Sequence, residues 1–195
     1  MSNNQNITNE SFLEEYFNQY KALIEPTGEL LENLYSFALS LNKMHSRGNK
    51  AIIVGNGGSS AIASHFSVDL TKNASVRCIN FNEADLITCF ANDYGFDNWI
   101  KHAIDFYGDA GDILIAISSS GKSKDIINGC NSARKNNFST IVTFSGFDEN
   151  NPLKECGDLN FWVNSKAYNF VENIHQFWLL AVVDLIIGKS EYPAN

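Results

Sequence analysis

Two glycine- and serine-rich stretches of this chain have the residue types that bind a phosphate group. The first follows the apolar run 51–54 and consists of Asn56, Gly57, Gly58 and Ser59. Glycine lets the backbone approach a ligand closely, and free N–H groups at a helix start favour an anion. The spacing is that of neither a dinucleotide-binding loop nor a P-loop. We expect Ser59 and Ser60 to cap the helix that follows, and the alternative to an anion site is an ordinary strand-to-helix turn.

The second stretch follows the apolar run 112–118, and its hydroxyl groups surround Gly121. These hydroxyls belong to Ser118, Ser119, Ser120 and Ser123. With only Lys122 and Lys124 as nearby cations in sequence, it predicts a phosphate cradle built from neutral donors. A serine-capped helix without a ligand is the alternative. Because ligands of open parallel sheets bind beyond the carboxyl ends of the strands, we expect the two stretches to converge on one ligand.

Two pairs of titratable residues have spacings that place each pair on one helix face. His65 and Asp69 are four residues apart, so they can hold a metal ion together or form a surface contact. Glu172 and His175 are three apart near the start of the last predicted helix. A carboxylate and an imidazole can move the protons of an aldose–ketose interconversion. Alternatively, the helix dipole favours Glu172 and the histidine is satisfied in the core or at an interface.

Alternating strands and helices must position these groups. Strands are predicted at 51–54, 76–81, 112–118, 139–146 and 159–165, and the last helix at about 169–187. This alternation predicts an α/β fold with a mostly parallel sheet. Apolar periodicity also predicts a helical arm over about 10–46, broken at Pro26 and Gly28. The arm must pack on the sheet domain or on another subunit, and we expect the second.

Composition excludes several classes of partner. A formal charge of −8 and a pI near 4.9 argue against binding to nucleic acid or to an anionic membrane. The four cysteines lack a CxxC pair, so the sequence predicts reduced thiols rather than a zinc ribbon or a disulfide framework. The first ten residues lack the features of a signal peptide, and no stretch has the roughly 18 apolar residues of a membrane span. We therefore expect a cytoplasmic protein.

Four segments together resemble a known family. They are GNGGSS at 55–60, ASHFSVDL at 63–70, ANDYGF at 91–96 and ISSSGKS at 117–123. The two loops are similar to those of the SIS (sugar isomerase) domain, and the other two segments resemble its phosphoheptose isomerase branch. The resemblance implies a single SIS domain over 1–195, with the arm at about 10–46 and the sheet domain at about 50–190. It also implies a five-stranded parallel sheet flanked by helices in a flavodoxin- or Rossmann-like three-layer fold.

The resemblance further implies an activity, a cofactor and an assembly. Members of this branch convert sedoheptulose 7-phosphate to glycero-manno-heptose 7-phosphate for the heptose of lipopolysaccharide or capsule. The implied assembly is a homotetramer with zinc-containing active sites between subunits. The substrate-binding positions of the family fall on Asn56, Gly57, Gly58, Ser59, Asn92, Asp93, Ser118, Ser119, Ser120 and Ser123.

The metal and catalytic positions are only partly retained. His65 matches a zinc-ligand histidine, and Asp69 stands where the family has a glutamate that is both ligand and base. Glu172 stands where the family has a glutamine ligand, and Leu180 where it has a catalytic histidine. We therefore predict a metal site of His65, Asp69 and Glu172, with Asp69, Glu172 and His175 as catalytic residues. The other hypothesis is a non-catalytic SIS protein that binds a sugar phosphate or scaffolds a partner.

Overall fold

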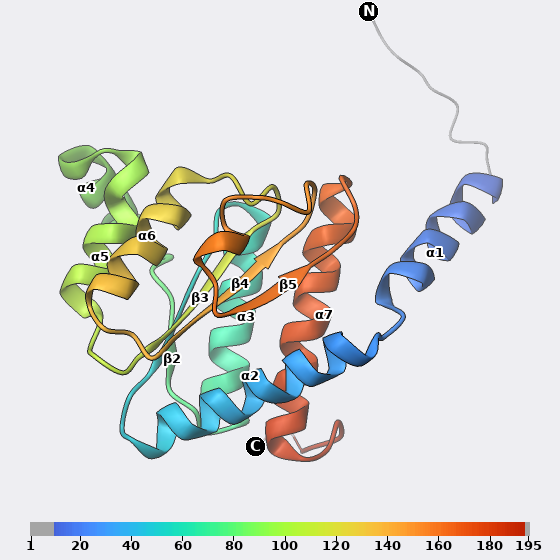
Figure 1. Cartoon of the computed structure of the whole chain (residues 1–195), viewed down its shortest axis with the longest axis horizontal. Helices are drawn as coiled ribbons and strands as arrows, with labels where there is room; N and C mark the ends of the chain where they lie inside the picture. Colours follow the sequence, from blue (N-terminus) through green and yellow to red (C-terminus); the bar gives the residue numbers. More distant parts are fainter. Residues whose placement is uncertain (1–9, 194–195) are drawn as a thin grey trace, which may run out of the picture.

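Five parallel strands form the centre of the protein. The computed structural model describes residues 10–193, so most of the segment assessed for a signal peptide lies outside it. The strands are β1 (Ala51–Val54), β2 (Cys78–Ile79), β3 (Ile113–Ser118), β4 (Thr140–Ser145) and β5 (Leu159–Trp162). They pair in the order β2-β1-β3-β4-β5, and every pair is parallel (Figure 1). The predicted five-stranded parallel α/β fold is confirmed.

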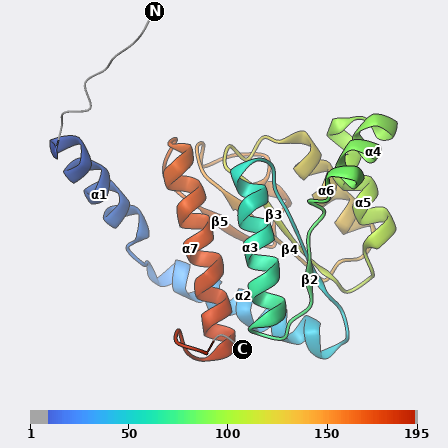
Figure 2. The ribbon, with the colours of Figure 1, turned by 180° about the vertical axis from the view of Figure 1, so that it is seen from behind.

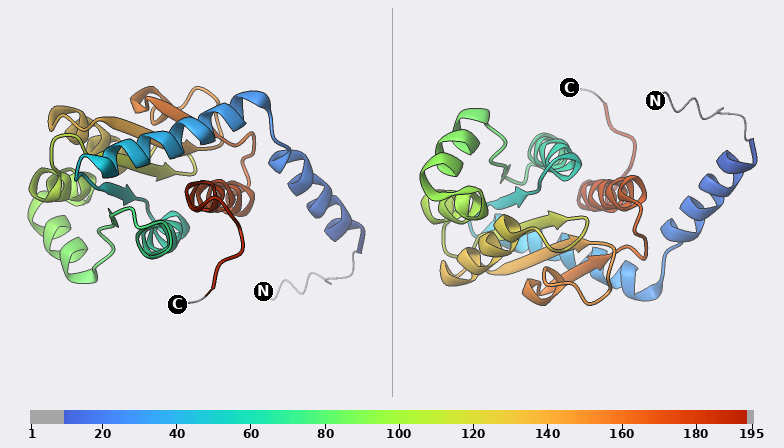
Figure 3. Two further views of the ribbon diagram at one scale, coloured as in Figure 1. Left: turned by 90° about the horizontal axis from the view of Figure 1, so that it is seen from below. Right: turned by 90° about the horizontal axis from the view of Figure 1, so that it is seen from above.

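Helices connect the strands, largely where apolar periodicity predicts them. They are α1 (Glu10–Ile24), α2 (Gly28–Ser46), α3 (Gly58–Lys72), α4 (Ala84–Tyr94), α5 (Trp99–Tyr107), α6 (Lys124–Lys135) and α7 (Tyr168–Ile187), with short 3-10 turns η1 (Phe96–Asn98) and η2 (Lys154–Cys156). The break at Pro26 is confirmed, and Thr27 caps α2 by accepting a hydrogen bond from the backbone N of Leu30 at 3.1 Å. Figures 2 and 3 show α3 and α7 running side by side.

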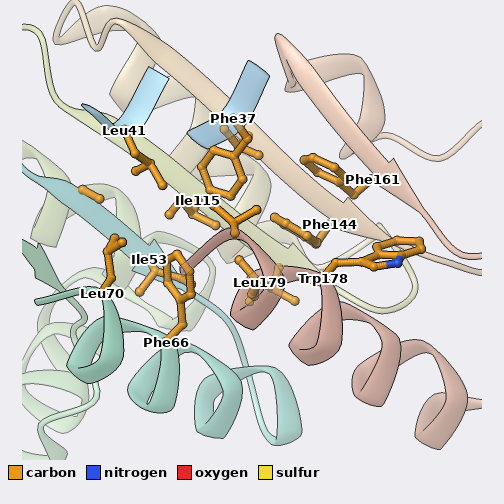
Figure 4. Close-up of a cluster of buried hydrophobic side chains, with 14 of the residues drawn as sticks. Phe37, Leu41, Ile53, Phe66, Leu70, Ile115, Phe144, Phe161, Trp178 and Leu179 are labelled. Carbon is orange, nitrogen blue, oxygen red and sulfur yellow. The ribbon is translucent and has the colours of Figure 1, made fainter. Parts of the chain in front are cut away.

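Two hydrophobic clusters hold the three layers together. Alternate residues along a strand point to opposite faces of a sheet. Ile53 and Ile115 accordingly join one cluster with α2, α3 and α7, whereas their neighbours Ile52 and Leu114 join a second with α5 and α6. Figure 4 shows the first cluster, where side chains such as Phe66 meet the sheet. Because helices cover both faces of the sheet, we look for the site where the strands end.

The two helices of the predicted arm have different environments. One apolar face of α2, which includes Phe37 and Leu41, is buried in the first cluster, so the expectation that the arm packs on another subunit rather than on the sheet domain is wrong for this face of α2. In contrast, α1 has no buried residue and exposes Phe12, Leu13 and Phe17. Its Tyr16 meets Phe170 of α7 with ring centres 4.5 Å apart, and its last turns pack partly buried side chains against the first cluster, whereas its first turns extend away from the sheet (Figure 1). For α1 the expectation stays a prediction.

One helix among the described residues, α7, is long and apolar enough to cross a membrane by composition alone. Its buried residues include Val171, Ile174, Leu179 and Val182, which pack in the first cluster beside the sheet. Such burial is typical of the core helix of a globular protein, and we interpret α7 in this way.

Candidate active site

The two predicted phosphate loops meet at the carboxyl edge of the sheet. β1 and β3 are neighbours, with Val54 paired to Ala116, so the loops that follow them leave the sheet side by side. A side-chain hydrogen bond joins the first loop to the start of α6, the helix that follows the second loop: Asn56 Nδ2 donates to Asp125 Oδ2 at 2.8 Å. Burial raises the pKa of Asp125. The expected convergence is confirmed, but Asp125 was missed although it directly follows the serine loop, in the first turn of a predicted helix.

The first loop leaves the start of α3 open. α3 begins at Gly58, its N-cap is Gly57 with φ +55°, and no side chain caps it. The expectation that Ser59 and Ser60 cap this helix is therefore wrong: no side chain caps α3, and Ser59 lies inside its first turn and is buried. A helix start without a capping side chain has N–H groups and a positive dipole end free to meet an anion.

The second loop is held in shape by its own serines and by its neighbours. Ser118 Oγ donates to Ser123 Oγ at 3.0 Å, and Ser120 Oγ accepts from the backbone N of Lys122 at 3.3 Å. Ser123 is the N-cap of α6, but its side chain does not cap the helix. The hydroxyl of Ser119 is buried without a hydrogen-bond partner among the described residues. The loop therefore keeps unused donor capacity, as an anion site requires.

Residues that follow β4 in the chain hold this loop in place through backbone hydrogen bonds. The backbone N of Leu153 donates to Gly121 O at 3.0 Å, and that of Gly146 to Ser119 O at 2.9 Å. Gly121 has φ +67° and packs against the buried Asn151, where a Cβ would have no room. Glycine is required here for both reasons.

The two nearby lysines are engaged with carboxylates. Lys122 Nζ lies 2.6 Å from Asp148, and Lys124 Nζ lies 3.6 Å from Asp97. This pairing agrees with the predicted cradle of neutral donors, since hydroxyl and backbone N–H groups remain as the donors nearest to a bound phosphate.

Glu172 brings a carboxylate from α7 to the start of α3. A Cβ added to Gly58 would lie 2.7 Å from Glu172 Cδ and 2.9 Å from Oε1. The carboxylate therefore rests directly on the backbone of the first phosphate loop. It is partly buried. A partly exposed carboxylate beside an anion site can accept a proton from a bound substrate.

His65 and Asp69 form a separate polar group farther along α3. His65 Nε2 lies 3.3 Å from Asp69 Oδ2, and Nδ1 lies 2.9 Å from Gln176 Nε2. Sequence reasoning missed Gln176, although it is one helical turn after Glu172 and polar within an apolar helix. Leu180 follows one turn later and is partly exposed. These three residues thus share the face of α7 that turns toward α3.

His65, Asp69 and Glu172 do not form one ligand cluster. Among residues 10–193 there is no group of three or more His, Cys, Asp and Glu side chains that could hold a metal ion. Glu172 rests on Gly58, about two helical turns from His65. Within a single chain the predicted three-residue metal site is therefore not assembled.

His175 lies in the core rather than in the site. Its side chain is fully buried, Nε2 donates to Ser145 O at 3.0 Å, and the ring packs edge-on against Phe144. Burial lowers its pKa to about 4. Its Nδ1 is buried without a hydrogen-bond partner among the described residues. This environment matches the alternative of a core histidine, although only one of its two ring nitrogens is satisfied, and it does not support a catalytic role for His175.

Asn92 and Asp93 lie apart from the two loops. Both are exposed on α4, where Asn92 Nδ2 donates to Asp93 Oδ1 at 2.8 Å and Cys89 Sγ lies 3.8 Å from Asp93. Their assignment as substrate-binding residues stays a prediction that requires a neighbouring subunit to bring them to a site.

Known proteins are similar to this chain in sequence and in fold. The family description that matches the chain is the SIS domain, over residues 15–145. A phosphoheptose isomerase from Fusobacterium nucleatum is 30% identical over 163 residues, covering 81% of this chain and 82% of that protein. The structure of phosphoheptose isomerase GmhA from Neisseria gonorrhoeae matches with a TM-score of 0.82 at 23% identity, covering 90% and 97% of the two chains. A phosphoheptose isomerase from Francisella tularensis matches with a TM-score of 0.83 at 24% identity, covering 91% and 97%.

Proposed function

We propose, because the chain belongs to the SIS domain family, that it is an isomerase that interconverts the aldose and ketose forms of a sugar phosphate. The substrate we favour is sedoheptulose 7-phosphate, which would be converted to glycero-manno-heptose 7-phosphate for surface polysaccharide. The observation that carries the proposal is the position of Glu172, whose carboxylate rests on Gly58 where two phosphate loops converge.

The phosphate of the substrate would bind between the two loops. The uncapped start of α3 and the hydroxyls of the serine loop supply neutral donors. The unpartnered hydroxyl of Ser119 supports this assignment, since a buried donor without a partner is costly unless a ligand satisfies it.

Glu172 would transfer the proton between C1 and C2 of the open-chain sugar. Its carboxylate accepts a proton from one carbon, and returning the proton to the other completes the interconversion. His65 would assist ring opening, because it is half-exposed and oriented by Asp69 one turn along α3 and by Gln176 of the neighbouring helix α7.

Zinc is a separate question, since the donors of a single chain do not suffice for it. A protein zinc site needs at least three protein ligands, whereas the described residues offer His65 and Asp69 as one adjacent pair. The residues present therefore do not fit the metal, and we derive no step through it. We propose zinc only for an assembled oligomer, in which another subunit supplies further ligands.

We also propose a cytoplasmic homotetramer with active sites between subunits. The exposed apolar residues support an assembly: Phe12, Leu13 and Phe17 on α1, Val68 on α3, and Phe177 and Leu185 on α7. Large apolar side chains gathered on exposed helix faces are typical of surfaces that another copy covers. Sedimentation equilibrium over a range of protein concentrations tests the tetramer.

The activity is tested by incubating the purified protein with sedoheptulose 7-phosphate and following formation of the aldose, with metal analysis of the same sample. We expect conversion by the parent protein. Glu172→Gln should abolish turnover but still bind the sugar phosphate in calorimetry, since the amide keeps the shape of the side chain and cannot take the proton. A fully active Glu172→Gln variant would refute the role of this carboxylate.

The second candidate is a non-catalytic protein that binds a sugar phosphate. Leu180 favours it, because the family resemblance places a catalytic histidine at this position. Binding of the sugar phosphate without conversion of any C5 to C7 phosphosugar would support this candidate over the isomerase.

A further inference from the structure

Two cysteines away from the proposed active site lie in direct contact. Cys130 is buried on α6, and Cys156 is partly exposed at the end of η2. Their thiols share a hydrogen bond, and Cys156 packs against the hydrophobic cluster that contains Cys130. Because α6 and η2 pack against each other at this point, the two cysteines are neighbours, as a disulfide requires, and Cys156 Sγ also donates to Pro152 O at 3.5 Å.

Arg134 fixes the relative position of the two elements. One turn after Cys130 on α6, its guanidinium donates to Cys156 O at 3.0 Å and to both carboxylate oxygens of Asp158 at 3.0 and 3.1 Å. A paired, bidentate arginine has well-defined geometry. It therefore keeps the backbone of Cys156 beside α6, the helix that carries Cys130.

The surrounding groups make the two thiols unequal. The hydrogen bond from Cys130 lowers the pKa of Cys156 to about 7, and the charge of Arg134 lowers it too, against the effects of burial and of Glu155. The same hydrogen bond, together with burial, raises the pKa of Cys130. At neutral pH the partly exposed partner is thus about half thiolate, whereas the buried partner keeps its proton. A low-pKa, accessible thiol beside a second thiol is the arrangement of a redox-sensitive pair.

We propose that Cys156 and Cys130 are a modification site that a peroxide oxidises to an intramolecular disulfide. The Cys156 thiolate attacks one peroxide oxygen, the O–O bond breaks, and the other oxygen leaves as hydroxide, so that Cys156 becomes a sulfenic acid. The Cys130 sulfur then attacks the Cys156 sulfur, the S–O bond breaks, and water leaves with the Cys130 proton. One peroxide is reduced and two thiols are oxidised, and a thiol reductant restores them.

The other two cysteines lack this arrangement in residues 10–193. Cys78 is buried, and its burial raises its thiol pKa. Cys89 is exposed, and its sulfur lies 3.8 Å from a carboxylate oxygen of Asp93 rather than beside a thiol. Cys89 is therefore a matched control for an accessible cysteine without a thiol partner.

A disulfide between Cys130 and Cys156 would link the two segments that hold the serine loop, which are α6 and the segment that ends in η2. α6 begins directly after that loop, and the segment that ends in Cys156 holds Gly121 through the backbone N of Leu153. The oxidation itself does not rest on the proposed isomerase activity, so its test needs no substrate.

The test treats the reduced full chain with hydrogen peroxide and follows thiols and mass. We expect free thiols to fall from four to two and the mass to fall by about 2 Da, with one cross-linked peptide that contains Cys130 and Cys156. Dithiothreitol should reverse the change. The initial rate should rise about tenfold from about pH 6 to about pH 8, as Cys156 ionises.

Three variants separate the roles of the cysteines. Cys156→Ser should form no disulfide, and Cys130→Ser should stop at a sulfenic acid that dimedone traps at Cys156. Cys89→Ser should react like the parent protein. Four thiols that persist in peroxide, or a disulfide that contains Cys89, would overturn the proposal. Should Cys130→Ser fail to fold, the cross-linked peptide of the parent and the Cys156→Ser variant still decide it.

Discussion

Replacing Gly58 by alanine tests whether the carboxylate of Glu172 must stay where it is. The added Cβ would meet Glu172 Oε2 most closely and lie 2.7 Å from Cδ, so the carboxylate must retreat by about 1 Å to reach ordinary contact near 3.4 Å. A misplacement of about 1 Å can cost a catalytic group roughly 100-fold in rate, so we expect kcat to fall by about 10- to 100-fold. The carboxylate is the flexible end of its side chain, and alanine suits a helix. Stability should therefore change by less than about 1 kcal/mol.

The assay measures initial rates of aldose formation from sedoheptulose 7-phosphate together with thermal unfolding. Gly28→Ala is the matched control, because Gly28 likewise begins a helix and no atom lies within 4 Å of its Cβ position. Gly58→Ala combined with Glu172→Gln should lose no more activity than Glu172→Gln alone, since both changes act on one group. Parental kcat in Gly58→Ala would refute the reasoning. A stability loss above about 3 kcal/mol would show that the backbone moved instead of the carboxylate.

Three further predictions concern stability and the serine loop. Burial lowers the pKa of His175 from 6.5 to about 4. Between pH 6.5 and about pH 4, His175 is therefore protonated in the unfolded chain but neutral in the folded chain. Stability should thus fall by about 3 kcal/mol as pH drops through that window, and urea unfolding of His175→Gln should lack this loss. Gly121→Ala adds a Cβ 2.7 Å from that of Asn151 at φ +67°; we expect a loss of about 1–3 kcal/mol and weaker calorimetric binding of sugar phosphate. Asp112→Ala leaves Lys50, whose Nζ lies 2.6 Å from the buried carboxylate, without this partner, and should cost about 3–5 kcal/mol in urea unfolding; a loss below about 1 kcal/mol would contradict it.

The sheet could be predicted because its strands are apolar runs bounded by turns. β1, β3 and β4 begin and end within one residue of the predictions, since each is buried on both faces. β2 is shorter than the predicted 76–81, because this edge strand pairs only through Cys78 and Ile79 with β1. Apolar character alone cannot indicate where an edge strand stops pairing.

The site could be predicted only in part, because a helical pattern fixes spacing but not which neighbour a face meets. Glu172 and His175 are three residues apart, yet one rests on α3 and the other lies in the core. In the sequence, His175 adjoins the apolar stripe that includes Val171, Ile174 and Trp178. Gln176 meets His65 because of how α7 packs against α3. The local sequence pattern does not predict which residues of the two helices lie opposite each other.

The exposure of α1 has a consequence for how the protein behaves on dilution. A helix of 15 residues without a fully buried side chain is only marginally stable in water. Its amide protons should therefore exchange rapidly in a dissociated chain, and a protease should cut within α1 before it cuts the sheet domain. If other copies cover Phe12 and Phe17, raising the protein concentration should slow both processes in α1 while leaving β3 unchanged.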